Sequence, residues 1–375
     1  MLRLAEAADG FLARVRLPGG LVSGEQLRVL ARLAGELGDG RVALTSRGNV
    51  QLRGLAAAAA SQLTSELAEA GLLPSLSHDR VRNVLASPLA GLDRGRDLTG
   101  IVRALDAALC ARPRLAELSG RFLFAVDDGR GDVAGLGADV VAAAGADATV
   151  VNGLAVRARD GVPDAMLACA EAFLDLRAEL GGSAWRVADL PDGAARVRAL
   201  VAERLGLAAV PEERGAADAR PVGLVARETV GGGESAEFVP DDARFSAVLI
   251  APLGRLTAAQ LTWIADRLTD RAARITPWRS VVLPFPDDAA GVLRAAASLG
   301  FGTDTASPWL RVTACAGRPG CASARADVQS DAAGFAARWP GQIVHVSGCE
   351  RHCGRPAATE IDVTATSEGY QIAGV

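Results

Sequence analysis

The stretch from Thr313 to Pro356 contains four of the six cysteines in the chain. It reads TACAGRPGCASARAD from residue 313 and VHVSGCERHCGRP from residue 344. Cys315 and Cys321 are separated by five residues, and Cys349 and Cys353 by three. Gly, Pro and Arg surround both pairs, which predicts loops, and each loop follows an apolar run typical of a strand. Four thiols on two such loops can hold a metal centre.

The spacing of the cysteines favours an iron–sulfur cluster. Structural zinc usually takes pairs separated by two to four residues, whereas a [4Fe–4S] cube is wider and is held by four thiolates. Zinc stays an alternative, as do two disulfides or burial in the core. The sequence shows no secretory signal, which argues against disulfides. Cysteines on Gly/Pro loops are not typical of a core. We expect Cys315, Cys321, Cys349 and Cys353 to ligate one [4Fe–4S] cluster.

The pattern C-x5-C…C-x3-C, with its Gly and Arg neighbours, resembles the cluster loops of the sulfite and nitrite reductase superfamily. In that superfamily the last cysteine lies beside a tetrapyrrole. The resemblance implies a similar fold and a site for a large, flat polycarboxylate.

An internal repeat agrees with this resemblance. FLARVRLPGGLVSGEQLRVLARL, from Phe11, aligns with FSAVLIAPLGRLTAAQLTWIADRL, from Phe245. With a gap of two residues, Ser46-Arg47-Gly48 then meets Trp278-Arg279-Ser280. A match of strand, turn, capped helix and strand indicates duplication. We therefore expect an α+β fold of two pseudo-symmetric repeats, each a ferredoxin-like half domain followed by an α/β unit.

The pattern of apolar residues and turn signals divides the chain further. Helices are predicted over 24–37 with Ser23 as the cap, and over 56–70, 98–109, 163–180 and 193–204. Two hairpins are predicted, one around DDGRGD and one around Asn152-Gly153. The expected domains are a first half domain (1–72), a first α/β domain (73–210), a linker (211–240), a second half domain (241–298) and a short cluster-binding domain (299–375).

The stretch from Ser46 to Arg53 alternates polar and apolar residues, as a strand with one buried face does. Its polar face would carry Arg47, Asn49, Gln51 and Arg53. An ordinary solvated strand face is the alternative. The resemblance implies that this face binds the carboxylates of a tetrapyrrole, for which the paired N–H groups of Arg are well suited. It implies the same role for three residues of the next segment, Arg80, Arg82 and Asn83. Arg279, the repeat mate of Arg47, is either a further ligand or a surface residue.

The three histidines are His78, His345 and His352. The resemblance implies a mononuclear non-haem iron, and such an iron prefers His and carboxylate ligands. His78 next to Asp79 is a weak candidate pair, and an ordinary satisfied histidine is the alternative. The other two cysteines, Cys110 and Cys169, lie in helical Ala/Leu-rich sequence and are expected to be inert core thiols.

The composition excludes several other classes. The net charge is -4, which gives no argument for nucleic acid. No apolar run is long enough to cross a membrane, so we expect a cytoplasmic protein. No convincing G-x-G-x-x-G motif is present. Electrons would therefore come from an external donor such as ferredoxin, flavodoxin or an NADH-linked reductase.

Two activities fit the resemblance. One is that of the precorrin-3B synthases of aerobic cobalamin biosynthesis. These monooxygenase-type enzymes use O2 to hydroxylate precorrin-3A and close a lactone, with a [4Fe–4S] cluster and a non-haem iron. The alternative is a sirohaem-containing sulfite or nitrite reductase. Three features favour the synthase: the short segment after Cys353, the SRGNVQLRGL sequence, and the absence of Lys, which reductases place in their anion pocket. All 40 basic residues here are Arg. A tetrapyrrole-carrying or iron–sulfur electron-transfer protein is a third, non-enzymatic alternative.

Overall fold

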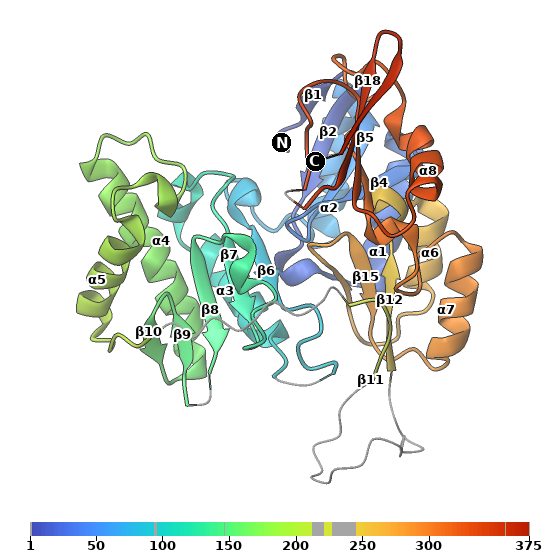
Figure 1. The fold of residues 1–375 in the computed structure, drawn as a ribbon. Helices are drawn as coiled ribbons and strands as arrows, with labels where there is room; N and C mark the ends of the chain where they lie inside the picture. Colours follow the sequence, from blue (N-terminus) through green and yellow to red (C-terminus); the bar gives the residue numbers. More distant parts are fainter. Residues whose placement is uncertain are drawn as a thin grey trace.

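The computed structural model describes residues 2–93, 96–145, 147–211, 221–226, 245–356 and 358–374. Most of the predicted linker, 211–240, lies outside these residues. Figure 1 shows the first α/β unit on one side of the molecule, and the two half domains with the cluster unit on the other. None of the described helices combines the length and the apolar character that a membrane crossing needs.

The first half domain is a sheet covered on one face by helices. Its five strands, in spatial order, are β1 (Ala5–Ala7), β2 (Gly10–Val15), β5 (Val50–Leu55), β4 (Arg41–Leu44) and β13 (Arg255–Thr257). Helices α1 (Gly24–Leu37) and α2 (Ala60–Glu69) bury Leu and Ala side chains against one face of this first sheet. Ser23 begins α1 with a capping box to Gln26, as the sequence predicts.

The second half domain repeats this arrangement. Its sheet contains β11 (Gly223–Ala226), β12 (Phe245–Ile250), β15 (Ser280–Leu283), β14 (Ala273–Ile275) and β3 (Leu21–Val22). Its helices are α6 (Ala258–Ala265) and α7 (Ala289–Ser298). Thr257 caps α6 through the same box to Gln260. Strand β11 lies within the predicted linker and pairs with β12.

The two halves exchange one strand each. Strand β3 of the first half pairs with β14 in the second sheet, and β13 of the second half pairs with β4 in the first sheet. Helices α1 and α6 pack against each other, and one hydrophobic core contains residues of both halves. The duplication predicted from the sequence is therefore a single interlocked unit.

The first α/β unit has a sheet in the order β10 (Leu154–Val156), β9 (Thr149–Val151), β8 (Val140–Ala144), β7 (Phe124–Asp127) and β6 (Val84–Ala86). Helices α3 (Thr99–Cys110), α4 (Val162–Glu179) and α5 (Gly193–Leu205) complete the unit. The Asn152-Gly153 hairpin joins β9 to β10, with both residues at positive φ.

The hairpin predicted around DDGRGD is wrong. Strands β7 and β8 are parallel, so the segment between them must return to the starting edge of the sheet. The buried carboxylate of Asp127 holds this return segment by accepting backbone N–H groups from Gly129, Gly131, Val133 and Ala134.

The cluster unit repeats the topology of the first α/β unit. Strands β16 (Val312–Ala314), β17 (Val344–Ser347) and β18 (Ile361–Thr366) are parallel, and β19 (Gly369–Gly374) is antiparallel to β18. Helix α8 (Val328–Arg338) connects β16 to β17, as α3 connects β6 to β7. The duplication therefore covers both the half domains and the α/β units.

Candidate functional site

The cysteine loops begin where the parallel strands β16 and β17 end, so they meet at one edge of the cluster sheet. The backbone N–H of Gly348 donates to Sγ of Cys315 at 3.1 Å, and the N–H of Arg325 donates to the carbonyl of Gly348 at 2.8 Å. A Cβ on Gly348 would lie 2.7 Å from Cβ of Ala324, so only glycine allows the two loops to approach this closely. All four cysteines are free thiols, half-buried except for the exposed Cys353.

The four thiols are spread more widely than the ligands of a single ion. Among the described residues, the one group with three potential ligand atoms within 4.8 Å of one another is Asp127, Asp128 and Asp132. No three of the four thiols are therefore that close. Zinc with Zn–S bonds of about 2.3 Å would hold its sulfur ligands about 3.8 Å apart. The thiols of Cys315, Cys321, Cys349 and Cys353, as described, are therefore not arranged for one zinc ion.

The same hydrogen bond occurs in the first α/β unit, where the N–H of Asp128 donates to Oγ of Ser87 at 3.1 Å. The backbone N–H groups of Ser87 and Cys315 also have equivalent acceptors, the carbonyl of Val126 in β7 and the carbonyl of Val346 in β17. Ser87 is thus the structural counterpart of Cys315. The first unit places an acidic loop where the second places cysteines, so the cysteines are not required by the fold.

An arginine-rich face lies on the open side of the first sheet. Arg14 pairs with Gln51, Gln51 with Ala43, and Ala43 with Arg255, so these residues form one row across four strands. Because side chains alternate along a strand, Arg16 and Arg53 lie on the same face. We call Arg14, Arg16, Arg47, Gln51, Arg53 and Arg255 the arginine face.

Three of these arginines have no carboxylate within 4 Å among the described residues: Arg14, Arg16 and Arg47. Burial lowers the pKa of Arg16 to about 10; the carboxylate of Asp79 opposes this shift, and the neighbouring Arg14 and Arg47 add to it. The Nε atom of Arg16 is buried without a described hydrogen-bond partner. Burial, followed by Arg186, also lowers the pKa of Arg47. Such a concentration of unpaired positive charge is costly unless an anion binds there.

The second sheet provides an internal comparison. Its corresponding row is Val248, Val282, Arg274 and Leu21, in the same register. Val248 and Val282 are fully buried against Leu89 and Leu92. One copy of the duplicated sheet thus has a covered, largely apolar face, on which the buried Arg274 donates to the carbonyls of Pro88 and Ala90. The other copy has the arginine face, with several arginines in place of one.

Two further members of the face already have partners. Arg53 binds Asp9 through two nitrogens at 3.0 and 3.1 Å and donates to the carbonyl of Gly320 at 2.9 Å. Gly320 lies between Cys315 and Cys321, so Arg53 attaches the first cysteine loop to the first sheet. Arg255 donates to Asp39. In the described conformation, Arg53 positions the cysteine loop and does not point a free guanidinium at a ligand.

Arg82, Asn83 and Asn49 form part of the interior. Arg82 makes a bidentate pair with Asp106 at 2.7 and 2.8 Å. The amide of Asn83 donates to the carbonyls of Arg80, Gly120 and Phe122 and accepts from Asn49. All three residues are buried. These contacts satisfy the polar groups of each residue within the protein. The sequence resemblance instead predicts that these residues contact a ligand.

The side chains of His78 and Asp79, the weak candidate pair, contact different parts of the protein. His78 is buried, with Nε2 3.0 Å from the carbonyl of Arg112 and Nδ1 within 3.0 Å of the hydroxyls of Ser75 and Ser77. The ring therefore offers no free lone pair. Asp79 is half-buried, its pKa is raised by burial, and its nearest charges are Arg16 and Arg82. Nothing in this geometry makes the pair a ligand set for iron.

Arg279 is not the structural mate of Arg47. Thr45 and Thr276 start the same turn, with N–H to carbonyl bonds of 2.9 Å to Asn49 and Ser280. Arg279 therefore corresponds to Gly48, and both have positive φ. The sequence alignment is wrong by one residue here, and Arg279 lies beside Gly254 in the second half domain. Arg80 is exposed and makes one long hydrogen bond, to the carbonyl of Ala116.

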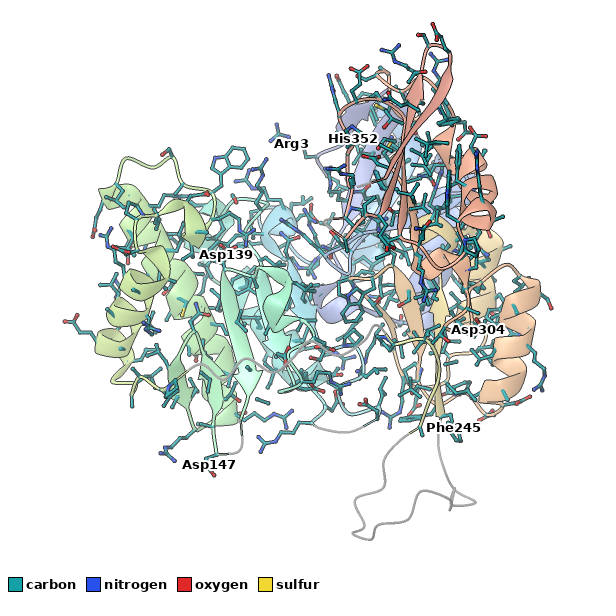
Figure 2. The ribbon with its side chains drawn as sticks, viewed as in Figure 1. Arg3, Asp139, Asp147, Phe245, Asp304 and His352 are labelled. Atoms are coloured by element: carbon teal, nitrogen blue, oxygen red, sulfur yellow. The ribbon has the colours of Figure 1, made fainter. Side chains whose placement is uncertain are left out.

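Sequence reasoning missed Arg14 and Arg16, although FLARVR alternates as SRGNVQLR does. It also missed a rim on the first α/β unit. Arg47 donates to the carbonyls of Gly120 and Arg121, and the guanidinium of Arg121 lies 4.4 Å from the ring centre of the exposed Trp185. Asp139 holds the Trp185 loop by accepting from Arg186 Nε and Val187 N. Figure 2 shows Asp139 on this unit and His352 on the cluster unit.

Comparisons with known proteins agree with this architecture. Residues 4–70 match the family described as "Nitrite/Sulfite reductase ferredoxin-like half domain". The fold matches that of the Mycobacterium tuberculosis NirA protein with a TM-score of 0.73 and 21% identity, over 96% of this chain and 73% of that chain. The chain thus has the α+β fold of nitrite and sulfite reductases, as the sequence predicts.

Two curated relatives match almost the whole of this chain. A precorrin-3B synthase from a Sinorhizobium species is 27% identical over 97% of this chain and 79% of the relative. The ferredoxin–nitrite reductase of Synechococcus elongatus is 26% identical over 97% of this chain and 78% of the relative. The predicted resemblance is confirmed, and these relatives support an enzyme of the oxidoreductase class.

Proposed function

We propose that this protein is a precorrin-3B synthase that oxygenates precorrin-3A in aerobic cobalamin biosynthesis. The arginine face is the observation that carries the proposal. Arg14, Arg16 and Arg47 present three guanidinium groups without carboxylate partners among the described residues. A tetrapyrrole with several acetate and propionate groups supplies matching negative charges over a large, flat area.

The surroundings of this face define how the substrate would be held. The first cysteine loop borders it through Arg53, and the rim containing Arg121 and Trp185 borders it through Arg47. Gln51 is half-buried within the face and its side-chain amide has no described hydrogen bond, so this amide is available to a ligand. Trp185 offers an aromatic surface beside Arg121 that suits stacking on a macrocycle.

The four cysteines would hold a [4Fe–4S] cluster next to this site. When bound, the cluster supplies one-electron transfer. The N–H of Gly348 would stabilise the sulfur of Cys315. In the proposed reaction one atom of O2 enters the product, and the other is reduced to water. The two electrons come from an external donor such as ferredoxin, flavodoxin or an NADH-linked reductase.

An isotope experiment tests the activity. Purified protein is given precorrin-3A, a reductant and 18O2, and the product is analysed by mass spectrometry. We expect one labelled oxygen in a hydroxylated, lactone-bearing product. Turnover of sulfite or nitrite together with stoichiometric sirohaem would contradict the proposal. The nitrite reductase relative keeps this second function open, and the strong visible bands of sirohaem distinguish the two in a single spectrum.

Substitutions on the arginine face test substrate binding. Charged hydrogen bonds of this kind contribute about 1.5–3 kcal/mol, so Arg14→Ala and Arg47→Ala should each weaken binding of precorrin-3A about tenfold or more. Arg47→Lys should restore only part of the affinity, because Lys lacks the planar fork. Equilibrium titration measures the change.

The exposed Arg80 provides the matched control, and Arg80→Ala should leave the affinity unchanged. Wild-type affinity in both Arg14→Ala and Arg47→Ala would mean that the arginine face is only a solvated surface.

A further inference from the structure

A row of buried polar residues crosses the cluster sheet. Thr313, His345 and Asp362 occupy directly paired positions on β16, β17 and β18. The neighbouring Val312, Val344 and Val363 point to the opposite face, where they form the core under α8. His345 is fully buried and Asp362 is 4% exposed. The polar row therefore lies inside the protein, on the side of the sheet away from α8.

The first α/β unit shows what this position contains when no function is required. The equivalent row on β6, β7 and β8 is Leu85, Ala125 and Val141, which form a small apolar cluster with Leu123 and Val133. The same topology is thus stable with apolar side chains here. Burying an imidazole and a carboxylate instead is unfavourable for folding, which indicates that a ligand compensates for it.

The surroundings of His345 favour one tautomer of its ring. Oγ1 of Thr313 can donate to the carbonyl of Val344 and lies 2.8 Å from Nδ1 of His345. Nδ1 then carries the proton and donates it to Thr313. Nε2 is left with a lone pair, buried and without a described partner. A metal-binding imidazole has this arrangement, since it usually donates its other N–H to a fixed acceptor.

A second histidine meets the same carboxylate. Nδ1 of His352 lies 2.9 Å from Oδ2 of Asp362, yet the contact does not have hydrogen-bond geometry. Two ligand atoms on one metal ion are about 3 Å apart, given metal–ligand bonds of about 2.1 Å. His352 has φ of 46°, in the left-handed region that His adopts more readily than most non-glycine residues. Oδ1 of Asp362 and Oγ of the buried Ser347 also lack described partners.

We propose that His345, His352 and Asp362 ligate the mononuclear non-haem iron of this enzyme. Two histidines and one carboxylate are the ligand set typical of Fe(II) oxygenases. The inference rests on the proposed function, which requires activation of O2. It places the iron in the cluster unit, next to the loop from Cys349 to Cys353.

Two adjustments accompany metal binding at this site. The three ligand atoms are not all within 4.8 Å of one another, so side-chain rotation must draw them together. Arg355, which binds Oδ2 of Asp362 at 2.7 Å, must also yield part of that contact, and Arg279 adds positive charge nearby. The mononuclear iron should therefore bind less tightly than the [4Fe–4S] cluster, and a chelator should remove this iron selectively.

Metal and sulfide analysis of anaerobically prepared protein tests the proposal independently of substrate. We expect about five irons and four acid-labile sulfides per chain, since a [4Fe–4S] cluster accounts for four of each. His345→Gln, His352→Asn and Asp362→Asn should each remove one iron and leave the sulfide unchanged. They should also abolish the electron paramagnetic resonance signal of the Fe(II)–nitric oxide adduct, which a mononuclear site gives.

Two matched variants complete the test. His78→Gln should keep all the iron, because both ring nitrogens of His78 are already bonded. Thr313→Val, which removes the acceptor of Nδ1, should weaken Fe(II) binding about 10- to 100-fold. Full iron and an unchanged nitrosyl signal in His352→Asn, on its partly exposed loop, would overturn the site even if His345 variants misfold. If the unsubstituted protein contained no acid-labile sulfide, this result would instead count against the cluster.

Discussion

Replacing any one of Cys315, Cys321, Cys349 and Cys353 with Ser is expected to abolish activity and to reduce both iron and sulfide severely. A cube held by four thiolates loses one of its bonds to the protein, and a hydroxyl is a poor substitute for a thiolate. The loops meet only at the edge of the cluster sheet, so no other described thiol can replace the missing one. Metal and sulfide analysis, together with the broad visible absorption of the cluster, measures the loss.

Cys110 and Cys169 are the controls for this prediction. Both lie in helices, and burial raises the pKa of Cys169 to about 12, which keeps it a protonated thiol. Cys110→Ser and Cys169→Ser should retain the full cluster. Complete iron and sulfide in two or more of the four ligand variants would refute the assignment of the cluster.

Arg82→Met is expected to destabilise the protein by about 3–5 kcal/mol, because it leaves the carboxylate of Asp106 without its partner in a largely buried position. The bidentate pair and the bond from Arg82 to the carbonyl of Leu72 link the start of β6 to α3. Chemical denaturation followed by circular dichroism measures the free energy of unfolding.

Arg80→Met is the matched control, since Arg80 is exposed, and we expect a change within about 0.5 kcal/mol. The pair of variants also decides between two roles for Arg82. Wild-type stability combined with weak binding of precorrin-3A in Arg82→Met would restore Arg82 as a substrate ligand, the role that the sequence resemblance implies.

Local signals in the sequence predicted the elements that depend on local chemistry. Ser23 and Thr257 each precede a Gln three residues later, and both form the capping boxes that begin α1 and α6. The Asn152-Gly153 pair predicted its hairpin because few other residues tolerate two positive φ angles. The two cysteine loops were predicted to follow short apolar strands, and they do follow β16 and β17.

Features that depend on distant partners were not predicted. Strands β7 and β8 are parallel because the segment between them returns to the starting edge of the sheet, and the DDGRGD sequence gives no sign of this return. The partners of Arg53 and Arg82, namely Asp9 and Asp106, are 44 and 24 residues away. A sequence with 40 arginines and no lysine also hides which arginines are unpaired. For the same reason Arg14 and Arg16 were overlooked.

The reciprocal exchange of β3 and β13 has an evolutionary consequence. Before duplication, a chain with a single half domain would have lacked the strand that now comes from the other half. It would gain that strand by pairing with a second copy of itself, as in a homodimer with two equivalent faces. In the duplicated chain the two faces are free to differ. One is covered, with Arg274 held by backbone carbonyls, while the other carries the arginine face.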